Sequence, residues 1–281
     1  MRREERTMKY SVLMSVYKND NPDFLRLALE SIYEKQTKKP DEIVVVFDGP
    51  ISDDLFNVLK SFRDGKEEIV KYYPQSENKG LGEALRIGSQ YCTGDYIFRM
   101  DSDDISAENR FEIQAKYVEE HPEIDVLGGD IAEFNKDPNE SSLRKRICPR
   151  NHKDIFEMGK KRNPMNHVTT CIKRDSLIKA GGYLTLKYIE DYYLWMRMIN
   201  ANLILENINK TLVFVRVGNG FSSRRGNKEY IKSWKILQTF MFDNKMITKR
   251  EARHNMLYIK TFIWMPSWAK KFVYSKLLRK R

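Results

Sequence analysis

The chain is poor in cysteine, and it has no long apolar run. Its 281 residues include three cysteines, Cys92, Cys148 and Cys171, which are widely spaced and odd in number. This pattern excludes a disulfide framework and a recognisable zinc ligand set. No stretch of sequence approaches the roughly 20 apolar residues of a membrane span, and the apolar run at residues 10–17 is too short for a signal peptide. These absences are typical of a protein of the reducing cytoplasm.

Positive charge is concentrated at the C-terminal end. The chain as a whole carries a net charge of +11. Residues 1–206 hold 32 Lys and Arg against 36 Asp and Glu, a net of −4, whereas residues 207–281 hold 18 against 3, a net of +15. A segment of this kind favours a polyanionic partner such as lipid headgroups, nucleic acid or a pyrophosphate-linked substrate.

Strand-like and helix-like segments alternate in the N-terminal half. The expected strands cover residues 10–17, 42–47, 69–73 and 96–100. The helical spacing of apolar residues predicts the intervening helices near 22–35, 53–62 and 81–92. The continuous apolar run at 42–47 is typical of a parallel strand that is buried on both faces. The alternation therefore predicts an α/β fold with a mostly parallel sheet flanked by helices.

Three carboxylates stand within four residues at the end of the strand expected at 96–100. They are Asp101, Asp103 and Asp104. Carboxylates crowded at one edge repel each other and raise each other's pKa unless a cation lies among them. The cluster therefore favours a divalent metal and, through it, a phosphate-bearing ligand. A solvated turn is the alternative that the triplet alone leaves open.

Polar residues follow two other expected strands. Ser15 to Asn19 ends the first, and Asp48 with Gly49 ends the second. Ligands of open α/β sheets bind beyond the carboxyl ends of the strands. If the strands are parallel, these residues and the carboxylate cluster gather at one edge of the sheet.

Six segments of the chain form an ordered set of motifs: residues 11–19, 41–49, 78–88, 99–105, 180–183 and 190–195. In these segments the chain resembles the family 2 glycosyltransferases, which have the Rossmann-like GT-A fold and use nucleotide-activated sugars. Each is a weak motif alone, but all six follow the family's order and spacing across roughly residues 10–200. The resemblance implies an α/β catalytic domain.

A nucleotide-sugar site is the first implication of this resemblance. Asp48 would accept hydrogen bonds from the base, and the glycine turn at Gly80 would open a helix towards the anionic part of the nucleotide. Simple turn chemistry is the alternative for this glycine. The implied contacts to the nucleotide-sugar are Ser15, Val16, Tyr17, Asp48, Lys79, Gly80, Arg86, Asp101 and Ser102.

The resemblance also implies a metal site and a catalytic base. Asp103 would bind Mn²⁺ or Mg²⁺ directly, and Asp101 would contact the ribose or reach the metal through water. Asp191 would act as the general base, and a single base without a covalent intermediate implies inversion. Glu190 and His167 would contact the acceptor. Alternatively, Glu190 only favours a helix N-terminus by its charge, and His167 is a hydrogen-bonded structural histidine.

We expect two regions along the chain. Residues 1–206 would form the GT-A catalytic domain, with a nucleotide-sugar half at about 8–105 and an acceptor half at about 106–206. Residues 207–281 would form a basic, largely helical extension. Its tryptophans and lysines at helical spacing favour a helix on an anionic membrane surface, or alternatively a helical subdomain packed on the catalytic core. No nucleic-acid motif is present in the sequence, so nucleic acid is not expected as a partner.

The sequence thus predicts an inverting, metal-dependent glycosyltransferase of bacterial surface polysaccharide biosynthesis, such as that of O-antigen, capsule or exopolysaccharide. It would move a hexose, galactose or glucose, from a UDP-sugar to a saccharide acceptor linked to polyprenyl pyrophosphate. It would be cytoplasmic and peripheral to the inner face of the cell membrane. The Gln-x-x-Arg-Trp motif of processive members is missing, which favours transfer of one sugar per encounter. The alternatives are a nucleotidyltransferase acting on sugar phosphates and a non-catalytic basic membrane-binding protein.

Overall fold

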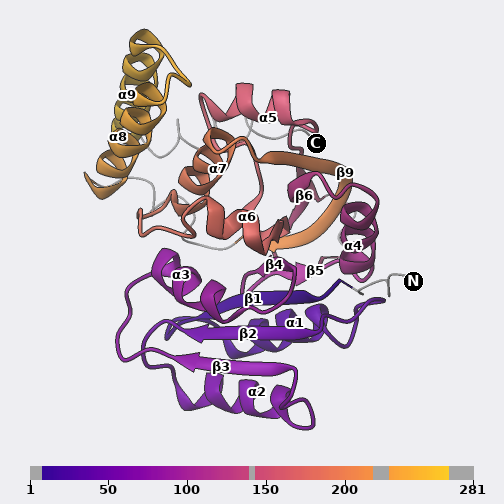
Figure 1. Ribbon diagram of the computed structural model, residues 1–281. Coiled ribbons are helices and arrows are strands. Elements are labelled where there is room, and N and C mark those ends of the chain that lie inside the picture. The colour runs from indigo at the N-terminus through magenta and orange to yellow at the C-terminus, as the bar shows by residue number, and fades with distance from the viewer. Residues whose placement is uncertain (1–7, 139–142, 218–227, 266–281) are drawn as a thin grey trace.

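One sheet runs through the molecule. The computed structural model describes residues 8–138, 143–217 and 228–265. Its strands are β1 (Tyr10–Val16), β2 (Glu42–Phe47), β3 (Val70–Pro74), β4 (Tyr96–Met100), β5 (Ile105–Ser106), β6 (Ile124–Phe134), β7 (Arg144–Arg146), β8 (Cys171–Lys173) and β9 (Ile204–Arg216). Within the described residues their order in the sheet is β3-β2-β1-β4-β8-β6-β9-β5, and β7 pairs with β6 (Figure 1).

Helices cover both faces of this sheet. They are α1 (Pro22–Ile32), α2 (Asp53–Arg63), α3 (Leu81–Tyr91), α4 (Arg110–Glu120), α5 (His152–Gly159), α6 (Arg174–Lys179), α7 (Glu190–Asn200), α8 (Lys228–Asp243) and α9 (Lys249–Trp264), and a short 3₁₀ helix spans His167–Thr169. Buried side chains of α1, α2 and α4 form one apolar cluster with the sheet. Those of α3 and of α5 to α9 join a second cluster.

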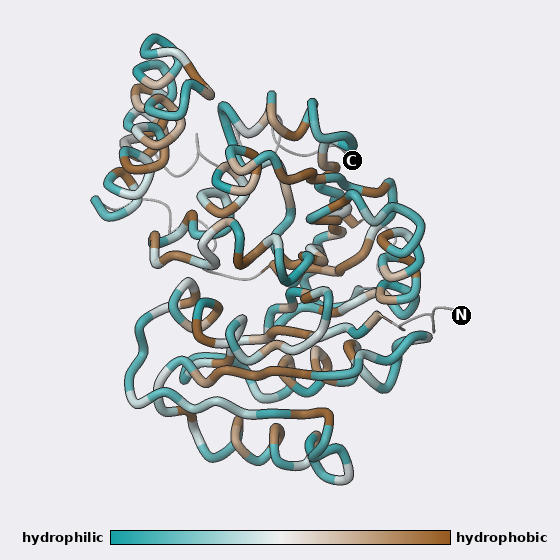
Figure 2. The backbone as a smooth tube through the Cα atoms, in the orientation of Figure 1, coloured by the Kyte–Doolittle hydropathy of each residue, from teal (hydrophilic) through white to brown (hydrophobic). Residues whose placement is uncertain are grey.

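The first four strands are parallel, as the sequence predicts. β1 lies between β2 and β4 and runs parallel to both, and β2 runs parallel to β3. Successive side chains of a strand point to opposite faces, so Val44 and Val46 pack with α3 while Ile43 and Val45 pack with α1 and α2. β2 is hydrophobic along most of its length (Figure 2). The predicted α/β class with a mostly parallel sheet is confirmed.

The sheet continues past residue 206, where the basic extension is predicted to begin. β9 runs from Ile204 to Arg216 and is parallel to β6 over most of that length. Its last residues also pair with β5, where Phe214 lies opposite Ile105. The first ten residues assigned to the extension, 207–216, therefore belong to the central sheet.

The C-terminal helices α8 and α9 pack beside the catalytic core (Figure 1). Trp234 of α8 meets the ring of Tyr192 of α7 edge to face, with ring centroids 5.7 Å apart. Tyr230 and Leu237 of α8 join the same apolar cluster. Within the described residues, then, the extension is helical after β9, and Tyr230 and Trp234 of α8 pack on the core, whereas Phe242 and Tyr258 are exposed. The predicted helix that follows Pro266 lies outside the described residues, and no described helix has the length and apolar character to cross a membrane.

We predict that Gly88→Ala destabilises the protein, although alanine favours helices. Gly88 lies where α3 crosses the sheet, and a Cβ atom there would come within 2.4 Å of Leu13 Cδ1 and 2.7 Å of Val46 Cγ2. Overpacking of this kind costs about 1–3 kcal/mol, whereas Gly→Ala in an open helix gains about 1 kcal/mol. Urea denaturation measures the sign. The exposed neighbour Gln90→Ala should be nearly neutral, and a more stable Gly88→Ala protein would contradict this packing.

Candidate active site

Strand ends meet at one edge of the sheet, as the sequence predicts. In the parallel register Val16 lies opposite Phe47, and Met14 lies opposite Met100. The chain leaves these three strands at the same edge and enters the loops that carry Tyr17, Asp48 and Asp101. The candidate site is built on this edge.

Asp48 ties the end of β2 to the start of α3. Its carboxylate accepts hydrogen bonds from the backbone N–H groups of Lys79 (2.8 Å) and Gly80 (3.0 Å). Gly49 beside it has φ +84°, and a Cβ atom there would come within 2.6 Å of the backbone nitrogen of Asn78. Glycine is therefore required for the close approach of the two loops. A carboxylate offers about four lone-pair sites, so Asp48 retains acceptor capacity for a ligand.

The two predicted basic contacts near α3 have protein partners. Lys79 Nζ lies 3.0 Å from Glu77, and Arg86 makes hydrogen bonds of 2.7 and 2.8 Å to Glu83. Thr185 donates a further hydrogen bond to Glu83. Arg86 is thus held at the junction of α3 with the segment before α7.

The loop after β1 is joined to the carboxylate cluster through Asp20. Asp20 Oδ2 accepts hydrogen bonds from Ser102 Oγ (2.7 Å) and from the backbone N–H of Tyr17 (3.1 Å). The carbonyl of Val16 accepts from the N–H of Asp48 (2.8 Å), and Ser15 is half-buried in β1. The predicted residues at the ends of β1, β2 and β4 therefore lie in one connected network.

A buried arginine stands behind Asp101. The Arg99 side chain is 1% exposed and pairs with Asp101, which is 41% exposed. Its positive charge lowers the pKa of Asp104 and Glu190, although burial raises both more strongly. The same charge helps to lower the pKa of His167. Arg99 thus acts on both halves of the site.

The other two carboxylates of the triplet differ in environment. Desolvation by the surrounding protein atoms, and then the negative charges of Asp101 and Asp20, raise the pKa of Asp103 to about 6. The Asp103 side chain is nevertheless exposed. Burial raises the pKa of Asp104 well above its ordinary value, and its carboxylate accepts a 2.9 Å bond from the N–H of Arg216. The Asp103 carboxylate is therefore accessible to a ligand, whereas the Asp104 carboxylate ties the loop after β4 to the end of β9.

The predicted base stands at the start of α7. Asp191 accepts a 2.6 Å hydrogen bond from Asn163 Nδ2 and a 2.7 Å bond from the N–H of Tyr192. Burial, and then the charge of Asp191, raise the pKa of its neighbour Glu190 to about 7. The start of α7 thus carries two adjacent carboxyl groups, of which Glu190 has the raised pKa.

His167 contacts Tyr183 and also Trp195 of α7. Its Nε2 is 3.0 Å from the hydroxyl of Tyr183, and its ring meets Trp195 edge to face at 5.9 Å. Burial, assisted by Arg99, lowers its pKa well below the ordinary value, so the imidazole is neutral. These contacts give His167 a packing role, and its contact with an acceptor stays a prediction.

The residues present suit a divalent metal. Among the described residues, no group of three or more His, Cys, Asp or Glu side chains could hold a metal by itself. Mg²⁺, however, is usually bound by one or two carboxylates together with waters and substrate phosphates. Asp101 and Asp103 supply two carboxylates whose mutual repulsion a cation would relieve. The donor set therefore fits a metal that arrives with a diphosphate.

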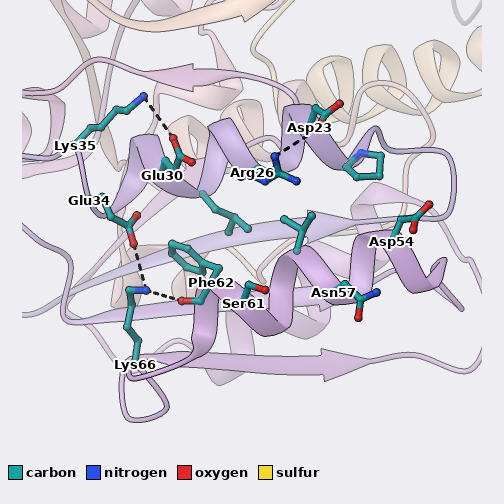
Figure 3. Close-up of a pocket in the computed structure, with 13 residues that line it drawn as sticks. Asp23, Arg26, Glu30, Glu34, Lys35, Asp54, Asn57, Ser61, Phe62 and Lys66 are labelled. Atoms are coloured by element: carbon teal, nitrogen blue, oxygen red, sulfur yellow. Dashed lines mark hydrogen bonds and ion pairs between the residues drawn. The ribbon is translucent and has the colours of Figure 1, made fainter.

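A separate hollow lies between α1 and α2, with a volume of about 780 Å³ (Figure 3). Exposed ion pairs stand around it, with Lys66 3.2 Å from Glu34 and Lys35 3.6 Å from Glu30. None of the predicted site residues, all of which the structure describes, belongs to its lining. This hollow is therefore outside the candidate active site.

The sequence analysis did not predict four residues that contribute to the site. Asp20 lies one residue beyond the polar segment after the first strand, and Asn163 lies four residues before His167. Arg99 precedes the carboxylates by two residues, a spacing that places it on the same side of β4 as Asp101. No pattern in the sequence indicated a role for Arg216 in the site.

The fold and the site define an α/β glycosyltransferase of the GT-A type. Residues 11–181 match the family model described as glycosyl transferase family 2. The chain belongs to glycosyl transferase family 2. This membership supersedes the nucleotidyltransferase and the non-catalytic membrane protein as alternatives.

Named relatives are similar over most of the chain. A protein of Haemophilus influenzae named an uncharacterized glycosyltransferase is 41% identical over 82% of this chain and 85% of its own. The amylovoran biosynthesis glycosyltransferase AmsE of Erwinia amylovora is 37% identical over 80% of this chain and 82% of its own. The UDP-Gal:alpha-D-GlcNAc-diphosphoundecaprenol beta-1,3-galactosyltransferase of Escherichia coli is 31% identical over 98% of both chains.

Solved structures share the fold at low identity. TarS of S. aureus in complex with UDP-GlcNAc has a TM-score of 0.68 and 17% identity over 90% of this chain and 71% of that chain. This chain covers 46% of a longer TarS structure. The mannosyltransferase PcManGT of Pyrobaculum calidifontis, in complex with GDP-Man and Mn²⁺, has a TM-score of 0.61 and 13% identity over 96% of this chain and 74% of that chain. These likenesses confirm the GT-A fold.

The raised pKa of Glu190 predicts a pH-dependent gain from Glu190→Gln. Its pKa rises from an ordinary 4.5 in the unfolded chain to about 7 in the fold, so the unfolded chain binds fewer protons between these values. Glu190 therefore costs the wild type stability as pH rises through this window, and a neutral amide at the same position would not. The stability of the variant relative to wild type should increase by about 2–3 kcal/mol between about pH 5 and pH 8. Urea denaturation across pH measures this difference, and the exposed Glu108→Gln serves as control. A difference that does not change with pH would contradict the burial of the pair.

Proposed function

We propose that this glycosyltransferase moves a single hexose, galactose or glucose, from a UDP-sugar to a saccharide acceptor carried on polyprenyl pyrophosphate, with inversion. The observation that carries this proposal is the hydrogen-bonded edge that joins the ends of β1, β2 and β4, together with the buried Arg99, which pairs with Asp101 and whose charge acts on Glu190 at the start of α7. The Escherichia coli relative, similar over 98% of both chains, is named for transfer from UDP-Gal to a diphosphoundecaprenol acceptor. The name of the Erwinia amylovora relative connects it with amylovoran biosynthesis. Bacterial surface polysaccharide assembly is the corresponding process.

The donor would lie along the edge of the sheet. Asp48 would accept from the uracil N–H, beside Ser15, Val16 and Tyr17, since its carboxylate keeps free lone pairs after it has bonded the Lys79–Gly80 turn. The N-terminus of α3, which no side chain among the described residues caps, suits the anionic part of the nucleotide. Contacts to the remainder of the donor are assigned to Lys79, Gly80, Arg86, Asp101 and Ser102.

Asp103 would hold Mn²⁺ or Mg²⁺, with Asp101 in reach through water or on the ribose. When bound, such a metal supplies positive charge that offsets the charge of the departing nucleoside diphosphate. Arg99 fixes the Asp101 carboxylate from behind, and Asp104 holds the loop to β9. These contacts keep the two carboxylates in place without the ligand.

Asp191 would take the proton from the acceptor hydroxyl. Asn163 fixes one carboxylate oxygen, and the Tyr192 N–H fixes the other. Glu190, whose raised pKa leaves it partly protonated near neutral pH, would donate or accept a hydrogen bond at the acceptor. A base in this position permits direct displacement, which inverts the anomeric centre.

We also propose that the protein acts at the inner face of the cell membrane. Leu257 and Tyr258 of α9 are 61% and 49% exposed, and Arg253 and Lys260 are exposed on the same helix. Exposed apolar side chains among cations suit an anionic lipid surface. The acceptor's lipid would then meet the enzyme at this surface.

Asp191→Asn should abolish transfer and leave UDP binding intact. The amide cannot take the acceptor proton, and removal of a general base costs about 10²–10⁴-fold in kcat. Measured turnover with a UDP-sugar and a separate titration with UDP give the two results. Asp243→Asn, an exposed carboxylate on α8, is the matched control. Retained turnover in Asp191→Asn would remove Asp191 from its role.

Donor choice is tested by a screen of nucleotide-sugars with Mn²⁺ or Mg²⁺ and a synthetic sugar-diphosphate-lipid acceptor. We expect release of UDP from UDP-galactose or UDP-glucose, because the Asp48 carboxylate would accept a hydrogen bond from the N–H of the uracil ring. Mass measurement of the product should show the addition of one hexose. Use of a GDP- or dTDP-sugar in place of every UDP-sugar would contradict the base assignment.

A further inference from the structure

A basic hollow lies between the end of α5 and the first turns of α9. Its volume is about 170 Å³. Its lining consists of Lys160, Lys161, Arg250, Glu251, His254 and Asn255. The donor and base roles assigned above use none of these residues.

The floor of this hollow is fixed by buried hydrogen bonds. Asn255 is 7% exposed, and its Nδ2 donates to the carbonyl of Lys160 (2.7 Å) and to Gln238 Oε1 (2.9 Å). Gln238 is itself buried in α8. The bonds join α5, α8 and α9, so the hollow is part of the folded core and does not depend on the position of a loop.

Charge in the hollow favours an anion. Lys160 is paired with Glu157 at 2.6 Å, whereas Lys161 and Arg250 are exposed and form no ion pair within the described residues. The one carboxylate of the lining, Glu251, accepts hydrogen bonds from the N–H (2.7 Å) and hydroxyl (2.8 Å) of Thr248 in a capping box. The N-terminus of the 16-residue helix α9 adds further positive potential.

A short stretch of chain connects the hollow to the proposed base. Lys161 precedes Asn163 by two residues, and two residues span at most about 7 Å. Asn163 in turn donates the 2.6 Å hydrogen bond to Asp191. The segment that lines the hollow at Lys161 thus also carries the residue that holds Asp191, so one acceptor molecule that reaches both would contact this segment along its length.

We propose that this hollow binds the diphosphate that joins the acceptor's first sugar to its lipid. The inference rests on the acceptor class of the proposed function. It means that the acceptor sugar is the one attached directly to the diphosphate. It also gives the basic residues of α5 and α9 a substrate-binding role that is separate from attraction to the membrane.

The test compares two acceptors in the double variant Lys161→Gln/Arg250→Gln. One acceptor is a sugar-diphosphate-lipid with a short polyprenyl chain, and the other is the same sugar as an alkyl glycoside without phosphate. The loss of two charge-assisted contacts should raise KM for the diphosphate acceptor by about tenfold or more. KM for the glycoside and for the UDP-sugar should change less than about twofold.

The matched control is Lys116→Gln/Lys210→Gln, which removes two exposed cations from α4 and β9. It should leave both KM values unchanged. An equal change for both acceptors in Lys161→Gln/Arg250→Gln, or no change for either, would overturn the proposal.

A binding measurement separates this proposal from the proposed function. Inorganic pyrophosphate is titrated without divalent metal into wild type, Asp103→Asn and Lys161→Gln/Arg250→Gln. Wild type and Asp103→Asn should bind it equally, and the double variant at least about tenfold more weakly. If wild type uses neither acceptor, the proposed function fails, but this titration still shows whether the hollow binds a diphosphate. Equal affinity for pyrophosphate in all three proteins would overturn the proposal for the hollow.

Binding to phosphatidylglycerol vesicles tests whether the hollow instead binds the phosphate of membrane headgroups. The double variant should retain most of the vesicle binding of wild type. Lost vesicle binding together with unchanged pyrophosphate affinity would assign the hollow to membrane headgroups and contradict its role in acceptor binding.

Discussion

The site depends on one buried cation, Arg99. A guanidinium that is 1% exposed is costly unless it is paired, and here the compensating charges are the carboxylates of the site. Asp101 pairs with it directly, and its field reaches Asp104 at the end of β4 and Glu190 at the start of α7. Its Nε and Nη1 are buried without a hydrogen-bond partner among the described residues. The charge of Arg99 therefore influences the pKa of carboxyl groups in both halves of the site.

The fold places these groups by joining elements that are distant along the chain. β4 brings Asp101 and Asp103 to the sheet edge, and β9 returns from the C-terminal region to hold Asp104 through Arg216. α7 carries the carboxylate pair, and α8 packs Trp234 against Tyr192 of that helix. The basic helices are thus packed against the element that carries the proposed base. Damage to this packing would be expected to affect the acceptor side more than the donor side.

The sequence predicted what is local and periodic. Continuous apolar runs such as 42–47 identified buried parallel strands, and the six ordered segments identified the family. Polar side chains at strand ends could be assigned to one edge, because parallel strands end together. Asp103 and Asp104, however, look alike in sequence, and only the return of β9 shows that Asp104 is buried.

The remaining features depend on tertiary contacts that spacing cannot reveal. Arginine is rarely buried, so the two-residue spacing that puts Arg99 on the same side as Asp101 did not by itself indicate a buried cation beneath the carboxylates. Asn163 and Asp191 are 28 residues apart, and their contact requires the packing of α7 beside the segment that follows α5. The boundary expected at 206 followed the change in charge, but β9 runs across that change, from Ile204 to Arg216, because its pairing with β6 continues to Phe134.

The central claim is that Asp101 and Asp103, backed by Arg99, form with the donor diphosphate a single metal site. The affinity for UDP, measured calorimetrically with and without Mn²⁺ in wild type and in Asp103→Asn, tests it directly. The account predicts that Mn²⁺ strengthens UDP binding to wild type by at least about tenfold, which corresponds to about 1.4 kcal/mol, and has little effect on Asp103→Asn. Equal UDP affinity with and without the metal in wild type would contradict it.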